Sequence, residues 1–177
     1  MNVIDFCQKI IFSPTLEDKL ISPDTVDCFR PLDNPFELPK YPARESYYDF
    51  SENRFKFPKP GSLHDENKRG VALHFFANHE LLAIEMMAGA ILKFSSTVDR
   101  KTFKKISVGI LSSLKDEQKH FSLYKKRMFE LGVSFGEVPL NDFFWRQFKH
   151  LNSFEDFFSI MSLTFEAANL DFAYFHY

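Results

Sequence analysis

The amino-acid sequence predicts an all-α protein whose long helices pack as a bundle. Apolar residues recur at three- and four-residue steps over residues 68–94, and a second stripe of the same period runs from Asp99 to about Leu131. Eight of the nine prolines lie before residue 61, so most of the later chain can sustain helices. Two long helices joined by a short turn must pack antiparallel, and a third helix from about residue 154 to the end extends the bundle.

The ends of these helices carry capping signals. Asp99 is a suitable N-cap for the second long helix, and Gly132 follows that helix where a C-terminal glycine is expected. Ser153 and Asp156 resemble a capping box that opens the third helix. Between the second and third helices, residues 133–152 are predicted to form a loop with a short turn at the Phe-Phe-Trp cluster.

The N-terminal third of the chain has a different composition. Residues 1–12 have the apolar spacing of a short amphipathic helix. Residues 13–62 cannot sustain long helices because prolines keep interrupting them, so we expect an extended arm wrapped on the bundle. We therefore divide the chain into a helix and Pro-rich arm, residues 1–62, and a helical bundle, residues 63–177.

Composition bounds the class of protein. With 177 residues, 45% of them hydrophobic, and a formal net charge of −2, the chain fits one globular domain with no strong field for nucleic acid. Cys7 and Cys28 form no CxxC pair, which excludes a usual thiolate zinc site and gives no sign of a disulfide scaffold. The N-terminus lacks a basic signal-peptide region, and no uninterrupted apolar run approaches a membrane span of roughly 18–20 residues. A cytoplasmic protein without a membrane partner is expected.

Charged residues interrupt the apolar stripes at four positions. Glu80 lies on the apolar face of the first long helix, Glu117 and His120 interrupt that of the second, and Glu166 lies on that of the third. A buried carboxylate without a partner costs several kcal/mol or becomes neutral. Three helices that each direct a carboxylate inward therefore suggest a shared cation.

The spacing of these residues supports a shared metal centre. Glu80 and Glu117 fall at similar heights if the first two helices are antiparallel. Glu117 and His120 form an E-x-x-H pair, which places both side chains on one helix face. This is the ligand pattern of di-iron or di-manganese carboxylate bundles, although carboxylate and imidazole ligands also suit zinc.

Simpler interpretations stand beside the metal hypothesis. E-x-x-H specifies only two residues, and an inward glutamate is more often a misjudged stripe or the partner of a lysine. Their combination on three helices makes the metal hypothesis about as strong as these alternatives. Glu85 is a weaker candidate ligand, and His79 is expected beside the ligands or at the surface.

The second long helix is also rich in basic side chains. Such a run more often forms a solvated helix face than a nucleic-acid contact, so nucleic-acid binding is the weaker alternative. The residues concerned are Arg100, Lys101, Lys104, Lys105, Lys119, Lys125, Lys126 and Arg127.

The segments FANHELLAIEMMAGAILKFS, LKDEQKHFSLYKKRMFELGVSFGEVPLNDFFW and LTFEAANLDFA carry a family resemblance. Over about residues 60–177 the chain resembles an uncharacterised ferritin-like family, a domain of unknown function. More distantly, HELLA and DEQKHF are similar to helices of the tRNA-modifying di-iron hydroxylase that oxidises an isopentenyl-type adenosine. The resemblance implies a ferritin-like bundle with Glu80, Glu117, His120 and Glu166 as metal ligands. It also implies a centre that activates dioxygen to oxidise an organic substrate.

The chain departs from these relatives at its C-terminal end. The relatives continue past the position of Tyr177 with a fourth helix that carries a second acidic-x-x-His pair. We therefore expect a C-terminally incomplete bundle whose iron or manganese centre lacks part of its ligand set, and which binds no metal if nothing completes it. The third helix would leave apolar surface uncovered, which favours a homo-oligomer or another chain that completes the fourth helix.

Two functions of different classes follow from these expectations. The first is a di-metal oxidoreductase or hydroxylase that uses oxygen, with Glu117 and Glu166 as bridging ligands and Glu80 and His120 as terminal ligands, as the resemblance implies. The second is a non-catalytic helical bundle that acts as an interaction or structural protein without a working metal centre.

Overall fold

The computed structural model describes residues 1–27, 29–48, 50 and 56–161. The described residues form helices and connecting segments with no β-strand, and an isolated parallel bridge joins Phe50 to Leu140. The α-helices are α1 (Val3–Phe12), α2 (Leu16–Lys19), α3 (Glu66–Phe94), α4 (Arg100–Glu130), α5 (Phe143–Phe148) and α6 (Phe154–Phe158). Short 3-10 turns are η1 (Pro23–Thr25), η2 (Ser46–Tyr48), η3 (Pro60–Ser62) and η4 (Ser95–Thr97). The all-α prediction is confirmed.

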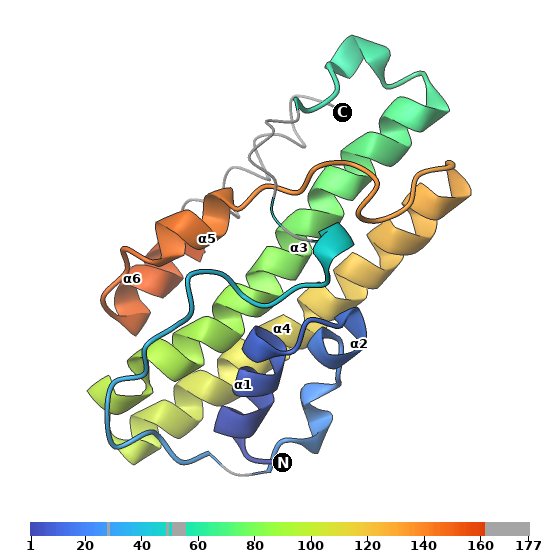
Figure 1. The fold of residues 1–177 in the computed structure, drawn as a ribbon. Helices are drawn as coiled ribbons and strands as arrows, with labels where there is room; N and C mark the ends of the chain where they lie inside the picture. Colours follow the sequence, from blue (N-terminus) through green and yellow to red (C-terminus); the bar gives the residue numbers. More distant parts are fainter. Residues whose placement is uncertain (28, 49, 51–55, 162–177) are drawn as a thin grey trace.

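Helices α3 and α4 form a long antiparallel pair that lies at the centre of the molecule (Figure 1). They span 29 and 31 residues. Asp65 caps α3 and Asp99 caps α4, because each carboxylate accepts hydrogen bonds from backbone N–H groups of the first helical turn. After α4 the backbone of Gly132 has φ 78°, the left-handed conformation that glycine adopts at little cost. The boundaries predicted for both helices are correct to within two residues.

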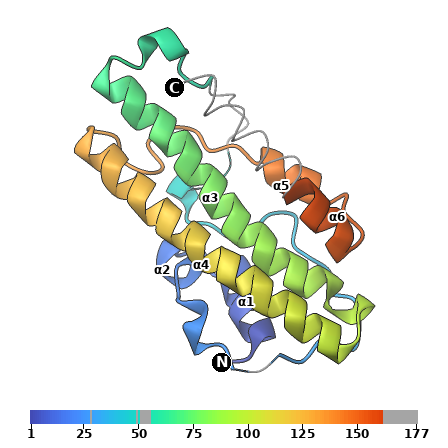
Figure 2. The same ribbon diagram turned by 180° about the vertical axis from the view of Figure 1, so that it is seen from behind.

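The other helices cover α3 from two sides. In both views α1 and α2 lie against the pair on one side, while α5 and α6 lie along α3 on the other (Figures 1 and 2). The helix predicted at the N-terminus is α1, and its buried face packs against α3. By length and composition, residues 66–97 could also cross a membrane, but 78% of the most apolar window is buried inside the protein. This burial is expected of a core helix.

The segment after α4 is more regular than its composition suggests. The expected loop with a short aromatic turn contains the helix α5, in which Trp145 and Phe148 are fully buried. Trp145 donates its ring N–H to the backbone oxygen of Lys40 at 3.0 Å. Burial of two large aromatic rings on one face of this short segment stabilises a helix that its sequence pattern alone does not reveal.

The third predicted helix begins where its capping signal places it. The hydroxyl of Ser153 accepts a hydrogen bond from the N–H of Asp156, and the Asp156 carboxylate accepts one from the N–H of Asn152. Helix α6 runs over Phe154–Phe158 and continues as a π-turn to residue 161. The remainder of the predicted helix lies outside the described residues, and so does most of the apolar face that was expected to need a partner.

Candidate metal centre

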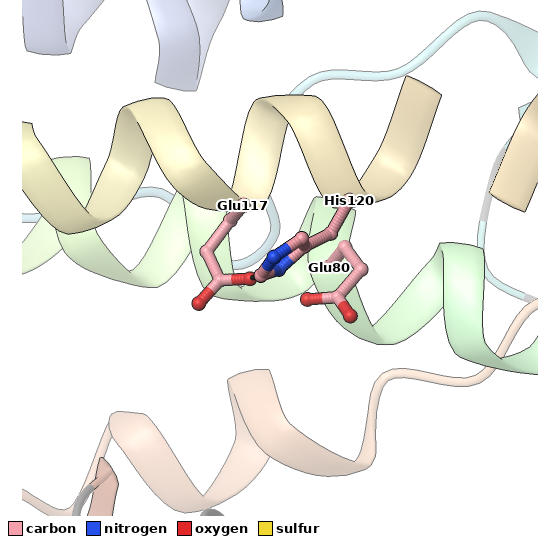
Figure 3. Close-up of side chains that lie close together, drawn as sticks. All are labelled: Glu80, Glu117 and His120. Atoms are coloured by element: carbon pink, nitrogen blue, oxygen red, sulfur yellow. Dashed lines mark hydrogen bonds and ion pairs between the residues drawn. The ribbon is translucent and has the colours of Figure 1, made fainter. Parts of the chain in front are cut away.

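Three of the four predicted ligands lie together between the long helices. Glu80 comes from α3, and Glu117 and His120 come from α4. One ligand atom from each residue lies within 4.8 Å of the others. Figure 3 shows the three side chains pointing toward one another. Glu166, the fourth predicted ligand, lies outside the described residues.

Helix geometry explains why these residues meet. Residues three apart on a helix share a face, so Glu117 and His120 stand side by side on α4. Their side chains touch, with Oε2 of Glu117 at 2.9 Å from Nδ1 of His120. Because α3 runs antiparallel to α4, a position in the middle of α3 falls opposite this pair, and Glu80 occupies it.

The site is open on one side. The Glu117 side chain is 14% exposed, whereas that of His120 is 53% exposed, and Glu80 is half-buried. A cation could therefore reach the cluster from the surface beside His120. The two carboxylates would be held in a less polar environment than the imidazole, where attraction to a cation is stronger.

Tyr124 lies beside the acidic cluster. It follows His120 by one helical turn, and its ring packs against Phe76 of α3 with 5.9 Å between ring centroids. Burial raises the pKa of the Tyr124 phenol, and the negative charges of Glu80 and Glu117 raise it further. The charges of the two glutamates therefore act on the phenolic oxygen.

Aromatic rings pack around His79, the residue before Glu80 on α3. His79 packs against Phe75 and Phe144, with ring centroids 4.3 and 4.6 Å apart. Burial lowers the pKa of His79 to about 4, so its imidazole is neutral near pH 7. His79, expected beside the ligands or at the surface, is half-buried among aromatic rings.

The donor atoms fit a hard or borderline metal ion. Two ligands at about 2.1 Å on opposite sides of one cation lie about 4 Å apart, so small side-chain rotations would bring all three donors into range. Two carboxylates and one imidazole suit iron, manganese and zinc, and a carboxylate can bridge two ions. The three described donors form half of the six-residue ligand set of a typical di-iron bundle.

Glu85, the weaker candidate ligand, belongs to a different structure. Its carboxylate is completely buried and forms ion pairs with Lys19 at 3.0 Å and Arg44 at 2.6 Å. Arg44 also donates to the side-chain oxygen of Asn78 at 3.2 Å. The interpretation of Glu85 as a possible ligand is therefore wrong, because two cations from the N-terminal segment already neutralise it.

Sequence reasoning missed Lys19 and Arg44 because no local pattern marks them. They lie 66 and 41 residues before Glu85, on a segment whose prolines and apolar residues dominated its interpretation. An available signal was Glu85 itself, an acid inside an apolar helix that required a cation from elsewhere. The sequence does not indicate which cation.

The basic residues of α4 form a largely solvated face. Lys101, Lys104 and Lys105 are exposed near the start of the helix. Farther along, Lys119 pairs with Asp116 and Arg127 pairs with Glu130, each three residues apart. Such exposed pairs contribute little to stability. This arrangement is typical of a charged helix surface.

The fold and the cluster define an all-α protein with carboxylate and imidazole side chains between two antiparallel helices. The model of a family described as "Protein of unknown function (DUF455)" matches residues 8–176. The chain belongs to this family, which confirms the expected membership of an uncharacterised domain family. No curated protein and no solved structure matches the chain.

Proposed function

We propose that the protein is a ferritin-like bundle with a di-iron or di-manganese centre that supports oxygen-dependent oxidation of an organic substrate. The observation that carries the proposal is the convergence of Glu80, Glu117 and His120 from two helices to within 4.8 Å. Two acids beside each other in a partly buried site repel unless a cation neutralises them. The resemblance of these helices to di-iron relatives supports the same chemistry.

In this proposal each ligand has a separate role. Glu80 and His120 would be terminal ligands, and Glu117 and Glu166 would be the carboxylates shared by two ions, as the resemblance to di-iron bundles implies. When bound, the metal pair supplies the redox chemistry that activates dioxygen. Within the chain, the Glu117 carboxylate would help to orient the ring of His120, which it contacts at 2.9 Å.

Further donors for a two-metal site are proposed to come from another chain or from a second copy of this one. We therefore include a homo-oligomer, or a partner that contributes a helix, in the proposal. A cytoplasmic location is part of the same proposal, since intracellular pools provide ferrous iron and electron donors.

The first experiment is elemental analysis of the purified protein together with its mass in solution. About two iron or manganese atoms per chain in the wild type are expected, with most of the metal lost in Glu80→Ala and His120→Ala. Asp116→Ala is the matched control, because Asp116 neighbours Glu117 on α4 but is exposed and pairs only with Lys119 among the described residues. Oxygen uptake in the presence of a reductant should follow the metal content.

Two results would reject the proposal. One is a folded wild-type protein without metal above trace after growth with iron and manganese. The other is metal binding that Glu80→Ala and His120→Ala leave unchanged. Circular dichroism of each variant shows whether a loss of metal reflects a loss of fold.

A non-catalytic interaction protein is the second candidate. The observation that favours it is exposed apolar surface on α4, where Leu123 is 64% and Phe129 is 71% exposed. Large exposed apolar side chains often mark contacts between proteins when they form a patch. Under this alternative Phe129→Ser changes the mass in solution, while the protein binds no metal and takes up no oxygen.

A further inference from the structure

Tyr124 lies on the same face of α4 as two of the proposed metal ligands. It follows His120 by four residues and Glu117 by seven, so the three side chains share one face of the helix. Side chains on a helix lean toward its N-terminus. The Tyr124 side chain therefore extends over the turn that carries His120.

A contact with Phe76 of α3 holds the Tyr124 ring on the side of α4 that carries the candidate metal site. Phe76 precedes Glu80 by one turn, and its ring packs against that of Tyr124 with 5.9 Å between centroids. Tyr124 is half-buried against the core, so its ring is not free to turn into solvent. The ring is consequently held between the two long helices, one turn from His120 on α4 and against the residue one turn before Glu80 on α3.

The charge environment agrees with this placement. Burial raises the pKa of Tyr124, and the charges of Glu80 and Glu117 raise it further. Within the described part of the chain, the hydroxyl group has no hydrogen-bond partner. A cation between these acids would reverse the local field and favour the phenolate.

We propose that Tyr124 is an additional oxygen ligand of the metal centre, so that Glu80, Glu117, His120 and Tyr124 together hold an iron ion. This inference rests on the proposed metal centre. A phenolate is a hard anionic oxygen donor that suits ferric iron. On binding, the phenolic proton passes to solvent through the exposed side of the site, and the oxygen forms a bond to the metal without any change in oxidation state.

A metal-bound phenolate has a spectroscopic signature that carboxylate and imidazole ligands lack. Charge transfer from phenolate to ferric iron gives a visible absorption band, and excitation in that band enhances vibrations of the phenolate ring. The test loads the full chain with ferrous iron, oxidises it in air, and records the iron content, the visible spectrum and the resonance Raman spectrum.

The wild type is expected to show the visible band and the phenolate vibrations. Tyr124→Phe should lose both completely while it keeps at least half of the bound iron, because three ligands remain. Tyr41→Phe is the matched control: Tyr41 lies on neither long helix and its ring contacts Phe50 and Lys149. This control should keep the band at full intensity.

The outcomes separate this inference from the proposed function. Iron bound in the wild type without phenolate vibrations overturns the role of Tyr124 and leaves the metal centre in place. The same band in wild type and Tyr124→Phe also overturns it. A folded wild type that binds no iron overturns both the centre and the ligand.

Discussion

Arg44 holds the carboxylate of Glu85 through two parallel hydrogen bonds, from Nε at 3.1 Å and from a terminal guanidinium nitrogen at 2.6 Å. Both side chains are almost completely removed from solvent, with exposed fractions of 1% and 0%. Lys19 joins them with its ammonium group 3.0 Å from Glu85. The N-terminal segment is therefore tied to the middle of α3 by charges and by apolar contacts.

Arg44→Met is expected to lower the free energy of unfolding by about 3 kcal/mol, at the lower end of the cost of breaking a buried ion pair. Methionine fills a similar volume but leaves Glu85 with Lys19 as its remaining cation, and it removes the donor to Asn78. Urea denaturation followed by circular dichroism measures the loss.

Arg30→Met is the matched control for this prediction. Arg30 is exposed, so its replacement should change the free energy of unfolding by no more than about 0.5 kcal/mol. Equal effects of the two substitutions would show that the buried pair adds nothing specific.

His74 makes the stability depend on pH. It is buried, and its ring accepts a hydrogen bond from the N–H of Gly136 at 3.0 Å. Burial lowers the pKa of His74 to about 4, from an ordinary value of 6.5. The unfolded chain therefore takes up a proton at a higher pH than the folded protein, and stability falls as the pH drops from about 6.5 toward 4.

His74→Gln should remove this part of the pH dependence. Between pH 7.5 and pH 5 the wild type loses about 2 kcal/mol that the variant keeps, because glutamine does not titrate in this range. His150→Gln, at an exposed position, is the control and should leave the pH profile unchanged. Parallel profiles for His74→Gln and the wild type would contradict the prediction. Denaturant titrations at each pH provide the measurement.

The long helices could be predicted from the sequence because their signals are local. The apolar period of α3 and α4, the Asp99 cap and the glycine at position 132 all act within one or two turns. Helix α5 was missed for the opposite reason, since its burial depends on contacts such as that between Trp145 and Lys40, 105 residues apart. Long-range packing overrides a weak local pattern.

The contrast between local signals and long-range packing also explains which parts of the candidate site could be predicted. Glu117 and His120 could be paired from their spacing, and Glu80 could be placed opposite them once two antiparallel helices were assumed. The partners of Glu85 could not be found, because a segment without a regular period gives no register for its side chains. The apolar period of α4 places Tyr124 on the buried stripe of that helix, but its packing on Phe76 near the acids depends on how α3 lies on α4.

Two glycines in the long helices should respond oppositely to substitution by alanine. A Cβ atom at Gly109 of α4 would meet no atom within 4 Å, so Gly109→Ala should stabilise the protein by about 0.5–1 kcal/mol through helix propensity. At Gly89 of α3 the added carbon would lie 2.9 Å from the ring of the buried Phe148.

Gly89→Ala is therefore expected to destabilise the protein by about 1 kcal/mol, because the cost of overpacking exceeds the gain in propensity. Thermal unfolding of the two variants checks both signs. A gain of stability at Gly89 equal to that at Gly109 would show that α5 can move away from α3 without cost.

Metal binding should stabilise the folded protein through the proposed ligands. Mn²⁺ at about 100 times its dissociation constant is expected to add about 2.7 kcal/mol to the free energy of unfolding, because the unfolded chain does not assemble Glu80, Glu117 and His120. For a protein of this size, that gain corresponds to a rise in Tm of roughly 5–10 °C.

The rise should disappear when EDTA removes the metal. It should be absent in Glu80→Ala and His120→Ala but present in Glu130→Ala, whose carboxylate pairs with Arg127 at the end of α4. An equal rise in Tm for all three variants would place Mn²⁺ elsewhere on the protein, and differential scanning calorimetry measures the effect directly.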